Sequence, residues 1–76
     1  MNNTLNRLQD IFRDVFDEDE MVITPTTTNE DIEDWDSMAQ LNLVVNIEKE
    51  FKVKFKVEEI AKIRKVNDFI VLIEAR

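Results

Sequence analysis

The stretch EDWDSMA, residues 33–39, joins an acidic segment to a helical pattern of apolar residues, and the rest of the fold can be built outward from it. Asp36 is a favourable helix N-cap, because its carboxylate can accept a hydrogen bond from a free backbone N–H in the first turn. Apolar residues then recur at helical spacing as far as Phe51, which predicts a helix over residues 36–51. Ser37 would place its hydroxyl at the positive end of this helix, where an anionic substituent such as a phosphate ester is stabilised.

Three further helices are expected. Residues 4–17 carry an apolar stripe at i, i+3, i+4, i+7 spacing, with Thr4 as the expected N-cap. The acids at residues 17–20 should end this helix, since negative charge at a helix C-terminus opposes the helix dipole. A short helical turn over residues 58–62 and a last helix over about residues 66–75 complete an all-α fold, a small four-helix bundle of three longer helices and one short one.

Residues 21–36 form a long connection between the first two helices, and it includes the turn-promoting Pro25. Its apolar residues are expected to pin it to the bundle; these are Val22, Ile23, Ile32 and Trp35. For Trp35 we favour a packing anchor over direct partner contact, because large aromatics commonly serve as anchors.

Residues 52–57 alternate polar and apolar, which by period alone indicates a strand. A lone strand would have no pairing partner, so an extended connector with Val53 and Phe55 turned inward is predicted instead. The chain contains no Gly, so left-handed helix ends are expected to fall to Asn or to go unused.

The helix predicted over residues 36–51 has two apolar surfaces. The expected core face consists of Leu43, Val44, Ile47 and Phe51. Met38, Leu41 and Val45 lie on the flank beside Ser37. Partners are expected to touch this flank, since a partly exposed Met adapts well to protein contacts. The alternative is that these side chains are buried under a neighbouring helix, and for Leu41 the sequence does not favour either interpretation.

The composition limits the chemistry that the chain can perform. Its 76 residues suit one small domain, residues 1–76, and a deep enzyme cleft is not expected. With no Cys and no His, it lacks a thiol nucleophile, an imidazole base and the usual soft metal ligands. No catalytic or metal site is therefore expected, and covalent chemistry would need an imported reactive group or another protein.

The net charge of −7 favours basic protein partners over nucleic acid or anionic lipid. Nine acids and no base lie between Asp17 and Asp36, so the acidic half of the chain surrounds Ser37; this half is interpreted either as a binding surface or as a solvated loop. No apolar run is long enough for a membrane span and no signal peptide is visible, which makes a cytoplasmic protein the default expectation.

At residues 36–38, DSM, the sequence resembles the acyl carrier protein family, whose motif is Asp-Ser-Leu at the start of the second helix. The resemblance continues along nearly the whole chain. It includes ITPT at residues 23–26, EKEF at 48–51, EE at 58–59 and VNDFI at 66–70.

The resemblance implies a monomeric carrier protein that is not an enzyme. Ser37 would hold 4′-phosphopantetheine, transferred from coenzyme A by a phosphopantetheinyl transferase, with Asp36 as motif residue and helix cap. The arm would carry acyl intermediates as thioesters to acyl-loading and acyl-transferring enzymes of fatty acid or polyketide biosynthesis. The implied docking surface is the second helix and the loop before it, with candidate contacts Trp35, Met38, Leu41, Val45 and Glu48. The implied shelter for an acyl chain is lined by Ile47, Phe51, Ile63, Phe69 and Ile73.

Several residues depart from the family pattern. Ala39, Gln40 and Asn42 stand where fatty-acid carriers often have acids, which suggests a stand-alone, specialised carrier. Lys56 and Lys65 precede the last two helices where better caps are usual, so those helix starts should be weaker or shifted. Two alternatives stay open: an aminoacyl carrier, either D-alanyl or peptidyl, and an unmodified acidic helical interaction module.

Overall fold

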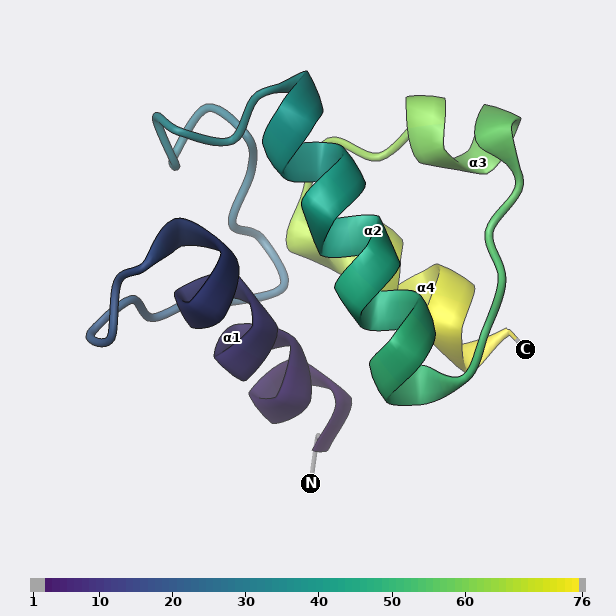
Figure 1. Cartoon of the computed structure of the whole chain (residues 1–76), viewed down its shortest axis with the longest axis horizontal. Coiled ribbons are helices and arrows are strands. Elements are labelled where there is room, and N and C mark those ends of the chain that lie inside the picture. Colours follow the sequence, from purple (N-terminus) through teal and green to yellow (C-terminus); the bar gives the residue numbers. More distant parts are fainter. Residues whose placement is uncertain (1–2, 76) are drawn as a thin grey trace.

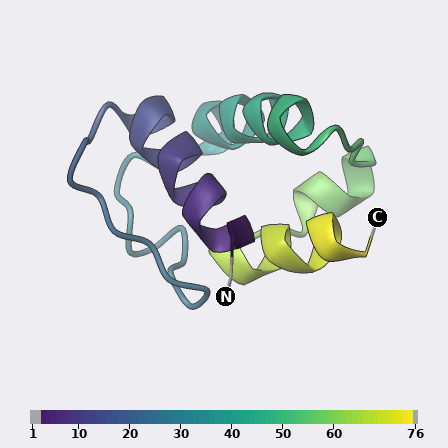
Figure 2. The same ribbon diagram turned by 90° about the horizontal axis from the view of Figure 1, so that it is seen from below.

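The computed structural model describes residues 3–75, and within them the backbone forms four α-helices and no β-strand. The helices are α1 (Asn3–Phe16), α2 (Ser37–Phe51), α3 (Val57–Ala61) and α4 (Val66–Glu74). Figure 1 shows α1 and α2 side by side, with α4 behind α2 and the long α1–α2 loop at one side. In Figure 2, α2 and α4 lie on opposite sides, α1 crosses one end and α3 closes the other. The predicted all-α fold is confirmed. None of the helices in residues 3–75 has the length and apolar character that crossing a bilayer requires.

The start of α1 differs from the prediction. Asn3, the first described residue, is already helical, so Thr4 lies inside α1 and its assignment as N-cap is wrong. Asn and Thr are both common capping types. Where such residues stand next to each other, residue type alone does not identify the cap.

Both longer helices end on a left-handed residue that is not Gly, namely Asp17 with φ 54° and Lys52 with φ 57°. At the end of α2 the N–H groups of Lys52 and Val53 both donate to the Glu48 carbonyl, the second at 3.2 Å. The expectation that such ends fall to Asn or go unused is therefore wrong. Asp and Lys take this conformation because bonds to the last carbonyls offset its steric cost.

Lys52→Gly is expected to raise the free energy of unfolding by about 1 kcal/mol, because Gly has no Cβ to clash in the left-handed region. Lys49→Gly, three residues earlier inside α2, is the matched control and should lower it by about 1 kcal/mol. Urea denaturation followed by circular dichroism measures both. Equal destabilisation by the two variants would show that Lys52 does not hold the left-handed conformation in solution.

The starts of α3 and α4 lie at or within one residue of the predicted positions, so the expected shift does not occur. Neither Lys56 nor Lys65 caps its helix with a side chain. Instead, each lysine's backbone N–H donates to an acid three residues later. The acceptors are Glu59 Oε1 at 2.9 Å and Asp68 Oδ2 at 3.3 Å. This is one half of a capping box, and it stabilises the first turn without a capping side chain at the lysine.

The connector between α2 and α3 is extended, as predicted. Val53 and Phe55 are half-buried, while Lys52, Lys54 and Lys56 are exposed. This alternation follows from an extended backbone, in which successive side chains point to opposite sides.

One of the predicted loop anchors is wrong, and the same alternation explains why. Ile23 and Trp35 are buried and Ile32 is half-buried, as predicted. Val22 is 72% exposed, so its assignment as an anchor is wrong. Met21 packs against the core in its place, because residues two apart in an extended segment share a side.

The long loop is also tied to the far side of the bundle by its backbone. Three hydrogen bonds of 2.8–3.0 Å join residues 25–29 to residues 64–67, at the start of α4. These bonds fix the middle of the loop, while Trp35 fixes its end.

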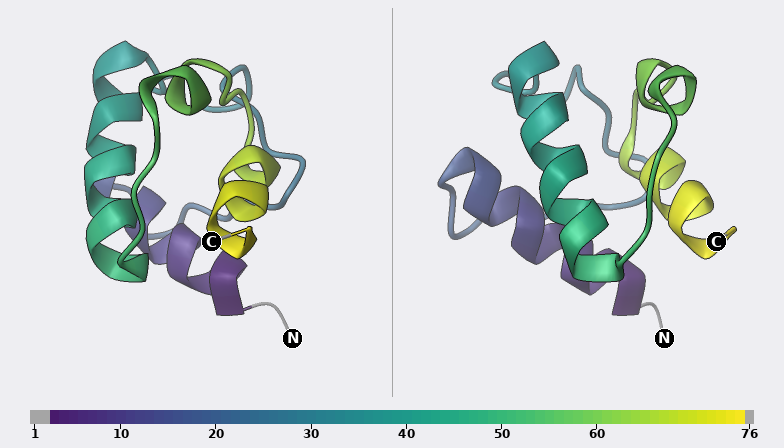
Figure 3. Two further views of the ribbon diagram at one scale, coloured as in Figure 1. Left: turned by 90° about the vertical axis from the view of Figure 1, so that its right-hand side faces the viewer. Right: turned by 45° about the vertical axis from the view of Figure 1, so that its right-hand side comes forward.

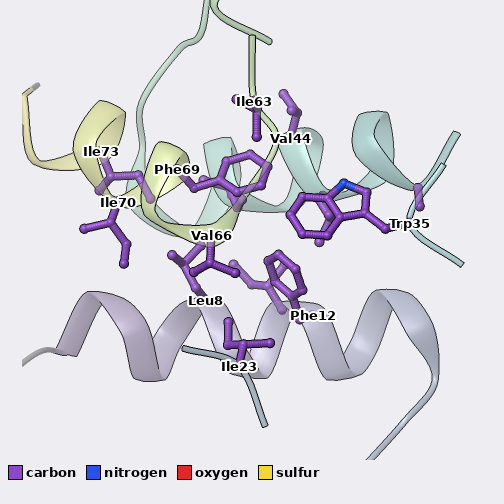
Figure 4. Packing of buried hydrophobic residues seen from close by; sticks show 14 residues of the cluster. Leu8, Phe12, Ile23, Trp35, Val44, Ile63, Val66, Phe69, Ile70 and Ile73 are labelled. Carbon is purple, nitrogen blue, oxygen red and sulfur yellow. The ribbon is translucent and has the colours of Figure 1, made fainter. Parts of the chain in front are cut away.

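Three aromatic rings join the helices at the centre of the core (Figure 4). The ring centroids of Trp35 and Phe69 lie 6.2 Å apart in a stacked arrangement. Phe12 meets both rings edge-on, with centroids 5.2 Å from Trp35 and 6.2 Å from Phe69. Because Trp35 is held by α1 and α4, the backbone two residues before Ser37 has a fixed position.

Candidate functional site

The start of α2 has the predicted geometry. Asp36 is extended, and its Oδ1 accepts the Ala39 N–H at 2.9 Å. Asp36 is therefore the N-cap, and Ser37 is the first residue of α2. The Ser37 side chain is exposed and makes no hydrogen bond within residues 3–75. Its hydroxyl faces solvent at the helix end, where the first N–H groups of α2 are not all used inside the helix.

Gln40 connects the loop, α2 and α3 through its side-chain amide. The Trp35 indole N–H donates to Gln40 Oε1 at 2.7 Å. Gln40 Nε2 donates to the carbonyl oxygens of Ile60 at 2.9 Å and Ile63 at 3.3 Å. One amide therefore satisfies a buried indole and holds α3 against the first turns of α2.

Sequence reasoning treated Gln40 only as a neutral substitution and missed this role. A signal was present, because Gln40 precedes Leu43, Val44 and Ile47 at the i, i+3, i+4, i+7 spacing of the core face. A polar side chain on a buried face needs hydrogen-bond partners. The sequence could therefore have marked Gln40 as the centre of a network, though not which partners it bonds.

A surface hollow of about 450 Å³ lies beside Ser37, between the end of the loop, the start of α2 and the end of α3. Figure 3 shows α3 in the space between α2 and α4, and in Figure 1 the α3–α4 connection runs behind the first turns of α2. The hollow is lined by Asn29, Trp35, Asp36, Ser37, Gln40, Leu41, Ile60, Ala61, Ile63 and Arg64. Its lining mixes apolar and polar groups, so a flexible, partly polar substituent on Ser37 could lie along it.

The flank of α2 beside Ser37 is open to solvent. Met38 is 67% exposed, Leu41 53% and Val45 50%, so burial under a neighbouring helix does not occur. Trp35 is only 6% exposed, which supports the anchor role over direct partner contact. Glu48 is half-buried, and its carboxylate accepts the Phe55 N–H at 2.9 Å, so it also serves the fold.

The residues suggested as an acyl shelter belong to the packed core. Ile47, Ile63, Phe69 and Ile73 are buried, and Phe51 packs against them from its half-buried position. The fold therefore brings these residues together from α2, the α3–α4 connection and α4.

The acidic loop keeps its charge towards solvent. Residues 17–20 are all exposed, as are Glu33, Asp34 and Asp36. None of these acids forms a salt bridge within residues 3–75. The acids before Ser37 are therefore not neutralised by neighbouring side chains.

Comparison with known families identifies the kind of site. The family model described as the phosphopantetheine attachment site matches residues 6–73. The chain belongs to this family. Members of the phosphopantetheine attachment family hold 4′-phosphopantetheine covalently, and the exposed Ser37 hydroxyl beside a hollow fits such a group.

Solved structures of acyl carrier proteins are similar to this family member over nearly its whole length. The holo acyl carrier protein from Geobacter metallireducens, solved by NMR in solution, is 41% identical with a TM-score of 0.87; the match covers 99% of this chain and 85% of that one. The acyl carrier protein from Thermotoga maritima is 27% identical with a TM-score of 0.84, covering 97% and 86%. No curated protein gives a significant match. The chain is thus a non-catalytic acyl carrier protein, which argues against an unmodified interaction module.

Proposed function

We propose that Ser37 is the residue that carries 4′-phosphopantetheine, added by a phosphopantetheinyl transferase, and that the arm presents acyl thioesters to partner enzymes. The observation that carries this proposal is the position of Ser37. It is the only serine in the chain and the first residue of α2, and its exposed hydroxyl has no hydrogen-bond partner within residues 3–75. A phosphodiester there would lie at the positive end of a helix.

The attachment reaction would use the Ser37 hydroxyl as nucleophile. Its Oγ would attack the phosphorus of coenzyme A that bears the pantetheine, forming a P–O bond and breaking the pyrophosphate bond to the departing adenosine 3′,5′-bisphosphate. The hydroxyl proton would go to a base on the transferase, since this chain has no His and no Cys. The arm would also supply the thiol that the sequence lacks.

The test is the intact mass of the protein after incubation with coenzyme A, magnesium and a broad-specificity phosphopantetheinyl transferase. The mass should rise by one phosphopantetheinyl group, and fragmentation of the peptide that contains residues 33–39 should place the group on Ser37. No mass gain, with a known carrier modified in a parallel reaction, would contradict the proposal.

We also propose that Met38, Leu41 and Val45 form the surface on which partner enzymes dock. Together with the acids before Ser37, these exposed side chains make an apolar strip beside negative charge. The partner surface that fits has an apolar centre and basic residues around it. Neither Trp35 nor Glu48 offers a comparable free side chain.

Val45→Glu should raise the KM of the transferase for the apo protein about tenfold, because it buries a charge in an apolar contact, with a smaller effect on kcat. Val71→Glu is the matched control, since Val71 on α4 is 56% exposed against 50% for Val45. Steady-state kinetics of both variants test the docking surface. A similar KM for the two would contradict it.

The specialised pathway and the cytoplasmic location expected from the sequence stay predictions, as does an aminoacyl cargo. Of the three neutral residues on the first turns of α2, Ala39 is buried and Gln40 is bonded inside the protein. Only Asn42 leaves an exposed side chain where fatty-acid carriers often present an acid.

A further inference from the structure

A single arginine faces the hollow beside Ser37. We propose that Arg64 binds the phosphodiester of an arm attached to Ser37 and so positions the arm along the hollow. This inference rests on the proposed role of Ser37. Arg64 was not singled out by sequence reasoning, because it lies 27 positions further along the chain and reaches the hollow only through the fold.

The position of Arg64 is fixed from three directions. Its backbone N–H donates to Asp68 Oδ2 at 2.9 Å, and its carbonyl accepts the Asn29 N–H at 2.8 Å. Its guanidinium Nη1 donates to the carbonyls of Ala61 at 3.1 Å and Ile63 at 3.4 Å. The loop, the end of α3 and the start of α4 therefore all contribute to holding this residue at the rim of the hollow.

The guanidinium keeps donors for another ligand. It forms no ion pair within residues 3–75, and in that range its Nε and Nη2 make no hydrogen bond. A guanidinium presents several N–H donors in a rigid planar fork that matches the oxygens of a phosphate. Arg64 can therefore hold its two carbonyls through one nitrogen and a phosphate oxygen pair through the others.

The charge around Ser37 favours a cation beside an attached phosphodiester. Among residues 3–75, the only charged residues that line the hollow are Asp36 and Arg64. A phosphodiester on Ser37 would stand next to the Asp36 carboxylate and the acidic loop, with the helix amides as partial compensation. Arg64 supplies the one full positive charge in the lining, whereas the neighbouring Lys62 and Lys65 do not line the hollow.

The experiment compares wild type, Arg64→Gln and the control Lys62→Gln, each in apo and holo form, by melting temperature and by ³¹P NMR of the holo form. The rise in melting temperature from the apo to the holo form should be about 2–5 °C larger in wild type and in Lys62→Gln than in Arg64→Gln. The ³¹P resonance of wild type should differ from that of the same arm on a peptide of residues 33–41. In Arg64→Gln it should move towards the peptide position, and the resonance of Arg64→Lys should lie between those of wild type and Arg64→Gln.

Each outcome separates the two proposals. Suppose that both wild type and Arg64→Gln are modified. If they then show the same ³¹P chemical shift and the same rise in melting temperature from apo to holo form, the role of Arg64 is overturned, while the proposed function of Ser37 stands. Equal effects of Arg64→Gln and Lys62→Gln would overturn it too, because general charge rather than a contact would then be responsible. A mass spectrum without the arm on wild type would overturn the proposed function itself. The apo melting temperatures report any loss of fold, and Arg64→Lys keeps the test valid if Arg64→Gln is unstable.

Discussion

Ser37→Ala is expected to lose all phosphopantetheine attachment while its free energy of unfolding stays within about 0.5 kcal/mol of wild type. The two effects separate because the side chain of Ser37 is exposed and unbonded in the described chain, while the capping bond belongs to Asp36. No other serine is available to replace it. Carrier activity should therefore vanish in a protein that folds normally.

Intact mass and urea denaturation of the same preparation measure both effects. Asp36→Ala is the matched control for stability, since removing an N-cap carboxylate costs about 1 kcal/mol. If Ser37→Ala were destabilised as much as Asp36→Ala, the hydroxyl would be part of the cap. If Ser37→Ala still gained the arm, attachment would lie on one of the threonines.

Gln40→Leu is expected to lower the free energy of unfolding by about 2–3 kcal/mol. Leu fits the apolar face of α2, so the loss comes from hydrogen bonds rather than from packing. It leaves the partly buried indole N–H of Trp35 without its acceptor, and it removes one of the hydrogen bonds that the carbonyls of Ile60 and Ile63 each accept. Unpaired buried polar groups cost more than a typical hydrogen bond contributes.

Asn42→Leu, on the exposed side of the same helix, is the control and should change stability by less than about 0.5 kcal/mol. A double-mutant cycle with Trp35→Phe isolates the indole bond, because Phe removes the N–H and keeps an aromatic ring. Additive losses from Gln40→Leu and Trp35→Phe would contradict a direct coupling between the two side chains. If the hydrogen bond between Trp35 and Gln40 stabilises the fold, the cycle should give a coupling energy of about 1 kcal/mol.

Much of α2 could be predicted from local sequence. The cap at Asp36, the buried face with Leu43 and Ile47 and the exposed flank with Met38 all follow from residue type and helical period. These properties depend on residues within one or two turns of each other. The same local reasoning placed the ends of α1, α3 and α4 within about one residue of their observed positions.

The features that local sequence did not predict depend on contacts formed only in the folded chain. The bonds from Gln40 to backbone carbonyls span 20 and 23 positions, and any residue type at the acceptor supplies the same carbonyl. The place of Arg64 beside Ser37 likewise depends on how the loop and α4 meet. At Lys52 the left-handed end follows from packing and carbonyl bonds that residue propensity does not contain.

Trp35 gives this carrier protein an optical signal of its own. It is the only tryptophan in the chain, and it lies two residues before the start of α2. Its side chain is 6% exposed, and its indole N–H donates a hydrogen bond to Gln40. Indole emission depends on the polarity and hydrogen bonding around the ring. Events that disturb the hollow, such as seating of the arm, entry of a cargo or contact with an enzyme, would change the fluorescence of the native chain. Binding and loading can thus be followed in real time without attaching a dye.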